Sequence, residues 1–300
     1  MCDSTAVKMI FVLGIQGRSG TNYLWDLLNL HPSVEAVSVA SEDWVVDQLH
    51  HVERLSTTLE KRWTLPPSDL RRRIGDEVAR QLARGIDDRV VLTKSPSVRN
   101  LELFPRYFPD AHLVLLIRDG RAVVESTVRS FGDSYEGVTR RWAENARSIV
   151  RFLECRDRRL HHLVRFEDLI GDRESTMRQL IAELGLEADC YDFTARLPGV
   201  RGSSELTQSG ALHWRPVDLG PGFDPTRRWA GWSAWRHARF AHLAYKEMLE
   251  LGYQVEPVKA PLHYRAGNRA LDAAWFVAGR PSLIASTRKV AAGLHLRGIV

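Results

Sequence analysis

The sequence predicts an α/β fold in which helices cover both faces of a parallel sheet. Short, continuously apolar segments alternate with segments of helical periodicity from the N-terminus to about residue 184. Fully apolar strands are typical of a parallel sheet that is buried on both faces. Glycines and charged residues directly follow several of these strands, as expected for loops at the ligand-binding edge of such a sheet.

The predicted elements follow in a regular order. Pro66, Pro67 and Gly85 interrupt the helical periodicity, and residues 196–228, rich in Gly, Pro and Ser, are predicted to form a loop across the site. Strands are predicted at residues 9–13, 34–39, 89–94, 111–117 and 160–166. Helices are predicted at residues 21–30, 43–61, 70–83, 101–108, 121–129, 135–154, 172–184 and 233–251.

Bulk composition limits the class of protein. With 44% hydrophobic and 26% charged residues, the chain has the composition of a folded globular protein. No run approaches the length of a membrane-spanning helix, and no basic leader precedes an apolar segment, so we expect a cytoplasmic protein. The three cysteines, Cys2, Cys155 and Cys190, have no metal-binding or redox spacing, and we expect no metal.

The positive charge is concentrated at the C-terminus. Residues 261–300 hold six basic residues and one acid, which equals the whole net charge of +5. The remaining body is balanced, so no nucleic-acid partner is predicted. We predict a main domain at 1–258 and a basic amphipathic extension at 259–300, with short helices at 270–277 and 281–288. The extension either packs on or beside the body or contacts an anionic membrane, an acceptor or a carrier protein.

The loop after the first strand has the features of an anion site. Glycines allow positive φ and close approach of a ligand, and the following helix N-terminus favours negative charge. The Walker pattern is not met, because the cation precedes the last glycine. Phosphate or sulfate binding is therefore predicted, although an ordinary βα turn can contain similar residues. The loop contains three glycines, one arginine and two hydroxyl side chains: Gly14, Gly17, Gly20, Arg18, Ser19 and Thr21.

A second anion signal follows the fourth predicted strand. Arg118 leaves that strand, and Ser126 lies eight residues later, about two turns into the next helix. An arginine fork and a hydroxyl suit a second phosphate group. For this pair alone, a salt-bridging arginine and a surface serine are an equal alternative.

Together these motifs resemble the sulfotransferases that use 3′-phosphoadenosine 5′-phosphosulfate (PAPS), in their bacterial-type branch. Four motifs occur in family order between about residues 8 and 254. They are the 5′-phosphosulfate loop at 17–22, the 3′-phosphate motif at Arg118 and Ser126, the strand end Val164–Leu169, and a C-terminal part with Val200–Ser204, Trp214 and Arg228–Trp229.

The resemblance implies a P-loop-like central parallel sheet flanked by helices, with a helical C-terminal cap. It also implies transfer of a sulfuryl group from PAPS to an acceptor hydroxyl, leaving adenosine 3′,5′-bisphosphate, without a metal. Tyr23 stands where the family often places an aromatic against the adenine, but core packing is an equal alternative. The 5′-phosphosulfate would contact Gly17, Arg18, Ser19, Gly20, Thr21 and Asn22, and the 3′-phosphate would contact Arg118, Ser126, Arg201, Gly202 and Ser203.

The catalytic base departs from one family pattern. Cytosolic members have Lys-Thr-His after the third strand, whereas this chain has Lys94 followed by Ser95 and no histidine. Lys94 remains as the cation, and Arg18 would stabilise charge on the leaving phosphate. Glu42 matches the glutamate base of the carbohydrate and tyrosyl-protein branches. Other interpretations are that Glu42 only favours a helix N-terminus, or that Asp43 or a histidine such as His213 is the base.

Two other functions fit parts of the pattern. A P-loop kinase acting with ATP is disfavoured by the absent Gly-Lys-[Ser/Thr]. A catalytically inactive nucleotide-binding protein of the same fold is consistent with the missing histidine. For an active enzyme, we expect the acceptor to be a small molecule, natural product, lipid or carbohydrate. The tryptophans in the segments expected to contact it favour an aromatic or lipid-like group.

Overall fold

The chain forms two compact units. The first comprises residues 1–118 and 148–200, and the second comprises residues 119–147 and 201–300. The computed structural model describes residues 7–37, 42, 44–63, 67–195, 224–257 and 261–277.

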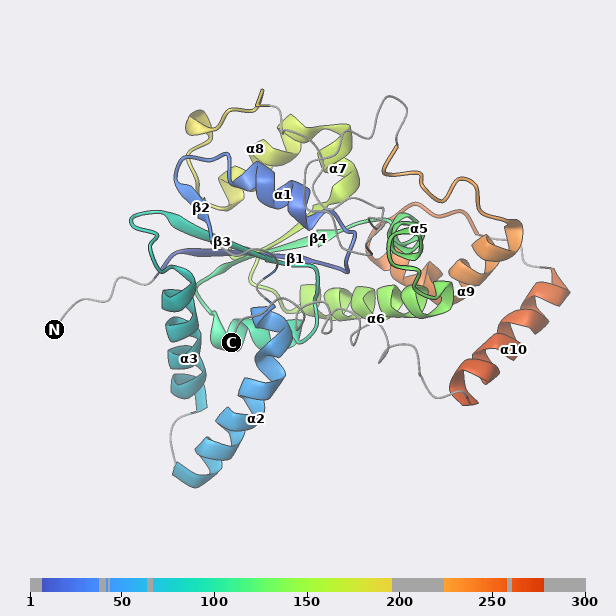
Figure 1. Ribbon diagram of the computed structural model, residues 1–300, viewed down its shortest axis with the longest axis horizontal. Coiled ribbons are helices and arrows are strands. Elements are labelled where there is room, and N and C mark those ends of the chain that lie inside the picture. Colours follow the sequence, from blue (N-terminus) through green and yellow to red (C-terminus); the bar gives the residue numbers. More distant parts are fainter. Residues whose placement is uncertain are drawn as a thin grey trace. The chain divides into compact units, whose positions relative to one another are not determined.

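A five-stranded parallel sheet forms the centre of the first unit (Figure 1). The strand order is β2-β3-β1-β4-β5, so that β1 lies in the middle and all strands end at the same edge. Every residue of β1 is buried, which explains its uninterrupted apolar sequence. The strands are β1 (Met9–Gly14), β2 (Val34–Ala36), β3 (Val90–Ser95), β4 (His112–Ile117) and β5 (His161–Arg165).

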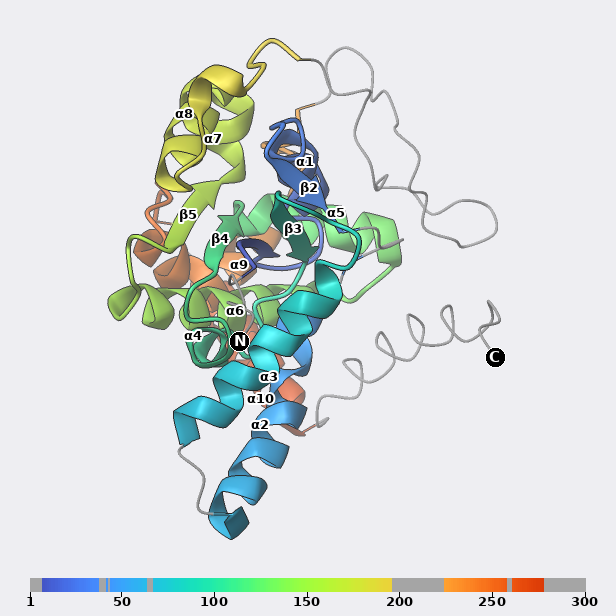
Figure 2. The same cartoon turned by 90° about the vertical axis from the view of Figure 1, so that its left-hand side faces the viewer.

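One face of the sheet is covered by α1 (Thr21–Leu28), α7 (Phe166–Gly171) and α8 (Arg173–Glu183), as both ribbon views show (Figures 1 and 2). Alternate strand residues such as Val12 and Leu116 pack in one buried cluster with helix residues such as Ile181. This cluster holds α1 against the sheet, and thereby positions the loop that precedes α1.

The opposite face is covered by a short helical segment formed by η1 (Leu101–Leu103) and α4 (Phe104–Tyr107). The ring of Phe11 lies 5.2 Å from that of Phe104 and 4.7 Å from that of Phe108. Helices α2 (Val45–Trp63) and α3 (Pro67–Leu82) form a hairpin that projects from this side (Figure 2). A Cβ on Gly75 would lie 1.8 Å from the Tyr107 carbonyl oxygen, so glycine is required where α3 meets α4.

The second unit is helical. It contains α5 (Gly120–Phe131), most of α6 (Tyr135–Glu154), α9 (Ala234–Glu250) and α10 (Leu262–Val277). The buried Arg239 of α9 donates to Glu136 of α6 at 2.9 Å and to Asp272 of α10 at 2.7 Å. Because a buried arginine must be paired, this network ties the three helices together.

The fold class predicted from the sequence is confirmed, and the main differences concern the limits of elements. Strand β5 ends at Arg165, and Phe166 begins α7, a helix absent from the prediction. Acidic residues in its first turn, Glu167 and Asp168, favour that helix start. Helix α10 begins at Leu262, eight residues earlier than predicted. No helix in the described part of the chain has the length and apolarity needed to cross a membrane.

Candidate active site

The loop between β1 and α1 is closed around Ser19. This buried serine donates from its hydroxyl to the Gln16 carbonyl at 2.5 Å, and its own backbone N–H donates to the same carbonyl at 3.2 Å. The backbone N–H of Gln16 donates back to the hydroxyl at 3.2 Å. Ser19 therefore shapes the loop from inside, in addition to any role toward a ligand.

Two residues of this loop have left-handed backbone conformations. Gly20 has φ 96° and Arg18 has φ 74°. Gly20 is also the N-cap of α1, and a Cβ there would lie 2.4 Å from the Phe166 ring. For Arg18 the conformation costs roughly 1–2 kcal/mol, because its Cβ crowds the backbone. Strain of this kind at a non-glycine residue is characteristic of functional loops.

The N-terminus of α1 has no side-chain cap among the described residues. An α-helix leaves its first N–H groups without partners inside the helix. In α1 these groups belong to the turn that starts with Thr21 and Asn22, at the positive end of the helix dipole. The predicted anion loop thus ends in a suitable set of donors.

Arg118 braces the same loop from the end of β4. Its Nη1 donates to the Arg18 carbonyl oxygen at 2.7 Å, and its guanidinium carbon lies 4.4 Å from the centre of the Phe166 ring. Only 6% of Arg118 is exposed. The sequence assigned Arg118 to a phosphate, and its contact with Arg18 adds a supporting role for the loop.

Lys94 joins the end of β3 to the start of α1. Its Nζ donates to Asn22 Oδ1 at 2.6 Å, lies 3.8 Å from Glu42 Oε1, and lies 5.6 Å from the centre of the Trp25 ring. The side chains of Lys94 and Glu42 are 8% and 13% exposed. Burying a charge is costly unless it is paired, so these contacts are what keep a lysine at this position. Two residues that the sequence assigned to catalysis, 52 positions apart in the chain, therefore lie side by side.

Two buried polar side chains next to these motifs were missed by the sequence predictions. Among the described residues, neither the amide of Gln16 nor the hydroxyl of Ser95 has a hydrogen-bond partner. They are 4% and 0% exposed. An unsatisfied buried polar group costs about 1–3 kcal/mol, and a polar ligand at the carboxyl edge of the sheet could supply the partners. Their positions beside the predicted loop and beside Lys94 are the signal by which they could have been found.

In the second unit, Ser126 of α5 is held by an arginine. Arg228 Nη1 donates to Ser126 Oγ at 2.9 Å, and Ser126 is 1% exposed. One residue further along the chain, the Trp229 ring lies 3.7 Å from the guanidinium carbon of Arg121. Arg228 belongs to the predicted C-terminal motif, which assigns it no ligand. The contact with Ser126 makes it a candidate for the same anion.

A carboxylate supports this part of α5. Glu125 Oε2 accepts from Trp232 Nε1 at 2.7 Å, and Glu125 Oε1 accepts from Arg129 at 2.6 Å. Burial by itself raises the pKa of Glu125, but the hydrogen bonds from Trp232 and Arg129 outweigh burial and lower it. The ionised carboxylate thus fixes the segment that carries Arg228.

Several predicted residues lie outside the described residues: Asp43, Arg201, Gly202, Ser203, His213 and Trp214. Within the described residues, no group of three or more His, Cys, Asp or Glu side chains is arranged to hold a metal ion.

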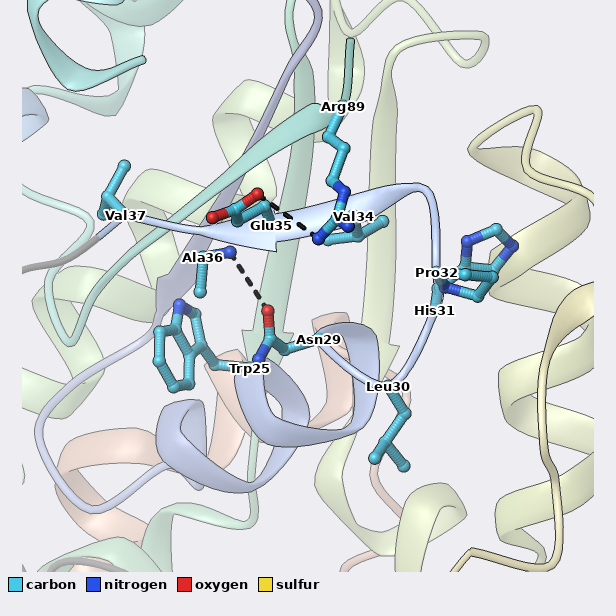
Figure 3. Close-up of a pocket in the computed structure, with 10 residues that line it drawn as sticks. All are labelled: Trp25, Asn29, Leu30, His31, Pro32, Val34, Glu35, Ala36, Val37 and Arg89. Carbon is cyan, nitrogen blue, oxygen red and sulfur yellow. Dashed lines mark hydrogen bonds and ion pairs between the residues drawn. The ribbon is translucent and has the colours of Figure 1, made fainter. Parts of the chain in front are cut away.

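A pocket of about 550 Å³ lies beside β2 and the end of α1 (Figure 3). Trp25, which approaches Lys94, also lines this pocket. Asn29 Oδ1 accepts from the Ala36 backbone N–H at 3.0 Å, and Arg89 pairs with Glu35 at 3.3 Å across its rim (Figure 3). The pocket therefore shares one aromatic wall with the group around Lys94.

Comparisons with known proteins identify the family. Residues 9–190 match the model of the sulfotransferase family, and the chain belongs to that family. Membership of this family supports the conclusion that the protein is a sulfotransferase. No curated protein matches the chain.

Two solved structures share the fold. The sulfotransferase domain from the curacin biosynthetic pathway has 19% identity and a TM-score of 0.55, covering 83% of this chain and 99% of that domain. The sulfotransferase domain from the olefin synthase of Synechococcus PCC 7002 has 19% identity and a TM-score of 0.53. The match covers 85% of this chain and 98% of that domain. The structural similarity extends over nearly the full length of each of these two solved domains.

Proposed function

We propose that this protein transfers a sulfuryl group from PAPS to a hydroxyl group of an acceptor molecule. One observation carries the proposal. The buried Lys94 lies 3.8 Å from the partly buried carboxylate of Glu42, and it donates to Asn22 of the anion loop at the carboxyl edge of the sheet. Sulfuryl transfer needs this combination, a base for the acceptor and cations for the charge that develops on the sulfuryl and phosphate oxygens.

The loop residues fit the 5′-phosphosulfate of PAPS. The loop offers the cation Arg18 and, among the described residues, an N-terminus of α1 without a side-chain cap and a Gln16 amide without a hydrogen-bond partner. Donors of these types suit a doubly charged anion. We assign the 5′-phosphosulfate to residues 17–22, with Ser19 holding the loop in shape.

We assign the 3′-phosphate to Ser126 and add Arg228, because the two side chains are hydrogen-bonded. A phosphate oxygen could accept from both groups in place of their mutual contact. For Arg118 the assignment rests on its eight-residue spacing from Ser126. Arg201, Gly202 and Ser203 keep the role implied by the resemblance to the family.

In the proposed reaction, the acceptor oxygen forms a bond to sulfur while the bond from sulfur to the 5′-phosphate oxygen breaks. The electron pair of that bond stays on the phosphate oxygen, which Arg18 stabilises. A carboxylate oxygen of Glu42 takes the proton of the acceptor hydroxyl, and Lys94 stabilises charge on the sulfuryl oxygens. PAPS supplies the activated sulfuryl group, and the residues supply position, charge and the base.

For the acceptor, we propose a small molecule, a natural product, a lipid or a carbohydrate. The curacin domain belongs to a biosynthetic pathway, which favours a natural product here also. We assign the part of the acceptor beyond the reacting hydroxyl to the pocket in Figure 3, because Trp25 connects it to Lys94. The protein is proposed to act in the cytoplasm without a metal.

Calorimetry and turnover test the proposal. We expect adenosine 3′,5′-bisphosphate to bind more tightly than ATP, and PAPS to yield sulfated products with an acceptor panel. Preference for ATP would instead identify a kinase. Binding of adenosine 3′,5′-bisphosphate without turnover of any acceptor would identify an inactive nucleotide-binding protein.

The assignment of Arg228 has its own matched control in the neighbouring, exposed Arg227. We expect Arg228→Met to weaken binding of adenosine 3′,5′-bisphosphate about 10- to 100-fold, the value of a hydrogen bond to a charged group. Arg227→Met should bind as the wild type. An equal loss for adenosine 5′-monophosphate, which lacks the 3′-phosphate, would show that Arg228 acts on another part of the nucleotide.

A further inference from the structure

Helix α10 carries an exposed face that the proposed reaction does not use. Leu262 is 82% exposed and Phe276 is 88% exposed, more than any other large apolar side chain that the structure describes. Residues 262, 266, 269, 273 and 276 follow one another in steps of four and three, which keeps them on one side of a helix. The two apolar ends of this stripe are about 21 Å apart along the axis.

The other side of α10 is already occupied. Asn268 and Asp272 accept hydrogen bonds from the buried Arg239, and the Tyr264 ring lies 5.1 Å from the Trp235 ring. Gly267 leaves room for Trp235, since a Cβ there would lie 2.9 Å from that ring. These contacts anchor α10 within its unit. None of them involves a residue of the outer stripe.

The outer side of α10 is positive. Arg265 and Arg269 are both exposed, whereas the helix's single acid, Asp272, is paired with Arg239, Arg140 and His242. Residues 261–300 hold six basic residues and one acid. A surface with apolar ends and exposed arginines is complementary to a layer that is apolar inside and negative outside.

We propose that α10 docks in the plane of an anionic lipid bilayer, with Leu262 and Phe276 inserted at the level of the headgroups. Arg265 and Arg269 keep their charged ends at the phosphates while their stems contact the apolar boundary. A protein groove would require large apolar anchors in successive turns, whereas here Ala266 and Ala273 occupy the stripe between its two ends. This proposal is independent of the reaction that the protein catalyses.

Sedimentation with vesicles tests it. We expect the full chain to bind vesicles of phosphatidylcholine mixed with phosphatidylglycerol, to release them as salt is raised, and not to bind phosphatidylcholine alone. Arg265→Gln with Arg269→Gln should lower the binding constant about 30-fold, from about one kcal/mol for each arginine. Leu262→Ser with Phe276→Ser should lower it at least about 10-fold.

A matched pair on α2 serves as the control. Arg54 and Leu55 are also exposed, Leu55 by 54%, so Arg54→Gln with Leu55→Ser should bind vesicles as the wild type does. Circular dichroism and thermal unfolding, unchanged in all variants, exclude misfolding as the cause.

Three results would overturn the proposal. They are absence of vesicle binding by the wild type, wild-type binding by both α10 variants, and a change of oligomeric state by light scattering in place of a change in vesicle binding. The last result would assign the stripe to a second copy of the chain.

Discussion

Two polar clusters lie at opposite edges of the same sheet, and they are built differently. At the carboxyl edge, Lys94 contacts Asn22 and Glu42 beside the anion loop. At the amino edge, His112 Nδ1 lies 3.1 Å from His162 Nε2, and His162 Nδ1 lies 3.2 Å from Glu183.

At the amino edge, the two rings and the Glu183 carboxylate pair with one another, whereas Nδ1 of the neighbouring His161 has no hydrogen-bond partner among the described residues. Burial lowers the pKa of His112 and of His162, which favours the neutral form of both rings. At the carboxyl edge formal charges remain, and the polar atoms of Gln16 and Ser95 have no partner among the described residues. Neutral rings that pair with each other contribute to folding, whereas a charged group beside unpartnered polar atoms is suited to a ligand.

The largest expected effect is on catalysis at the carboxyl edge. Glu42→Gln keeps the shape of the side chain but removes the proposed base, and should lower kcat about 10³-fold. Calorimetry should give unchanged affinity for adenosine 3′,5′-bisphosphate. A near-normal rate would assign the base to Asp43 or to a histidine such as His213.

Lys94→Ala removes the cation and should lower kcat about 10²-fold, because charge on the sulfuryl oxygens loses one stabilising group. Measurement of kcat and KM with PAPS checks this. His112→Gln, at the amino edge, is the control and should leave kcat unchanged. An equal loss of kcat in Lys94→Ala and His112→Gln would contradict the proposal that only the carboxyl edge takes part in catalysis.

Within the loop, two glycines differ in how much the fold depends on them. Gly20→Ala should lower the free energy of unfolding by about 2–4 kcal/mol, because alanine is strained at φ 96° and its Cβ meets the Phe166 ring. Gly17→Ala should change it by less than about 0.5 kcal/mol, since no atom lies within 4 Å of a Cβ there. Urea denaturation compares them, and similar losses would contradict the loop geometry.

The smallest expected effect is a pH dependence of stability that comes from the histidines at the amino edge. The pKa values of His112, His161 and His162 are lowered in the folded protein, chiefly by burial. As pH falls below about 6.5, these histidines therefore bind protons in the unfolded chain before they do so in the folded protein. The free energy of unfolding is thus highest above that pH and decreases on acidification. Thermal unfolding across this range should show it. His162→Gln should weaken the dependence, and an unchanged profile would show that the cluster does not cause it.

Much of the site could be predicted because its parts are local motifs. A glycine loop between an apolar strand and a helix predicts a βα anion loop, and strand ends in a parallel sheet share an edge, which brought Lys94 and Arg118 to the same edge as that loop. The start of α7 at Phe166 could not be read, because an apolar residue after a strand also continues the strand. The importance of Gln16 and Ser95 could not be predicted either, because it depends on their having no hydrogen-bond partner within the part of the chain that the structure describes.

By itself, the sequence determined the order of the five strands and of the helices other than α7, the anion loop and the residue types of the proposed catalytic group, since these depend on periodicity, glycine and charge over short distances. Only the tertiary structure decided that Lys94 contacts Asn22 and Glu42, that Arg118 braces Arg18 and that Arg228 meets Ser126. Such contacts depend on how distant elements pack, and no local pattern of residues specifies that packing.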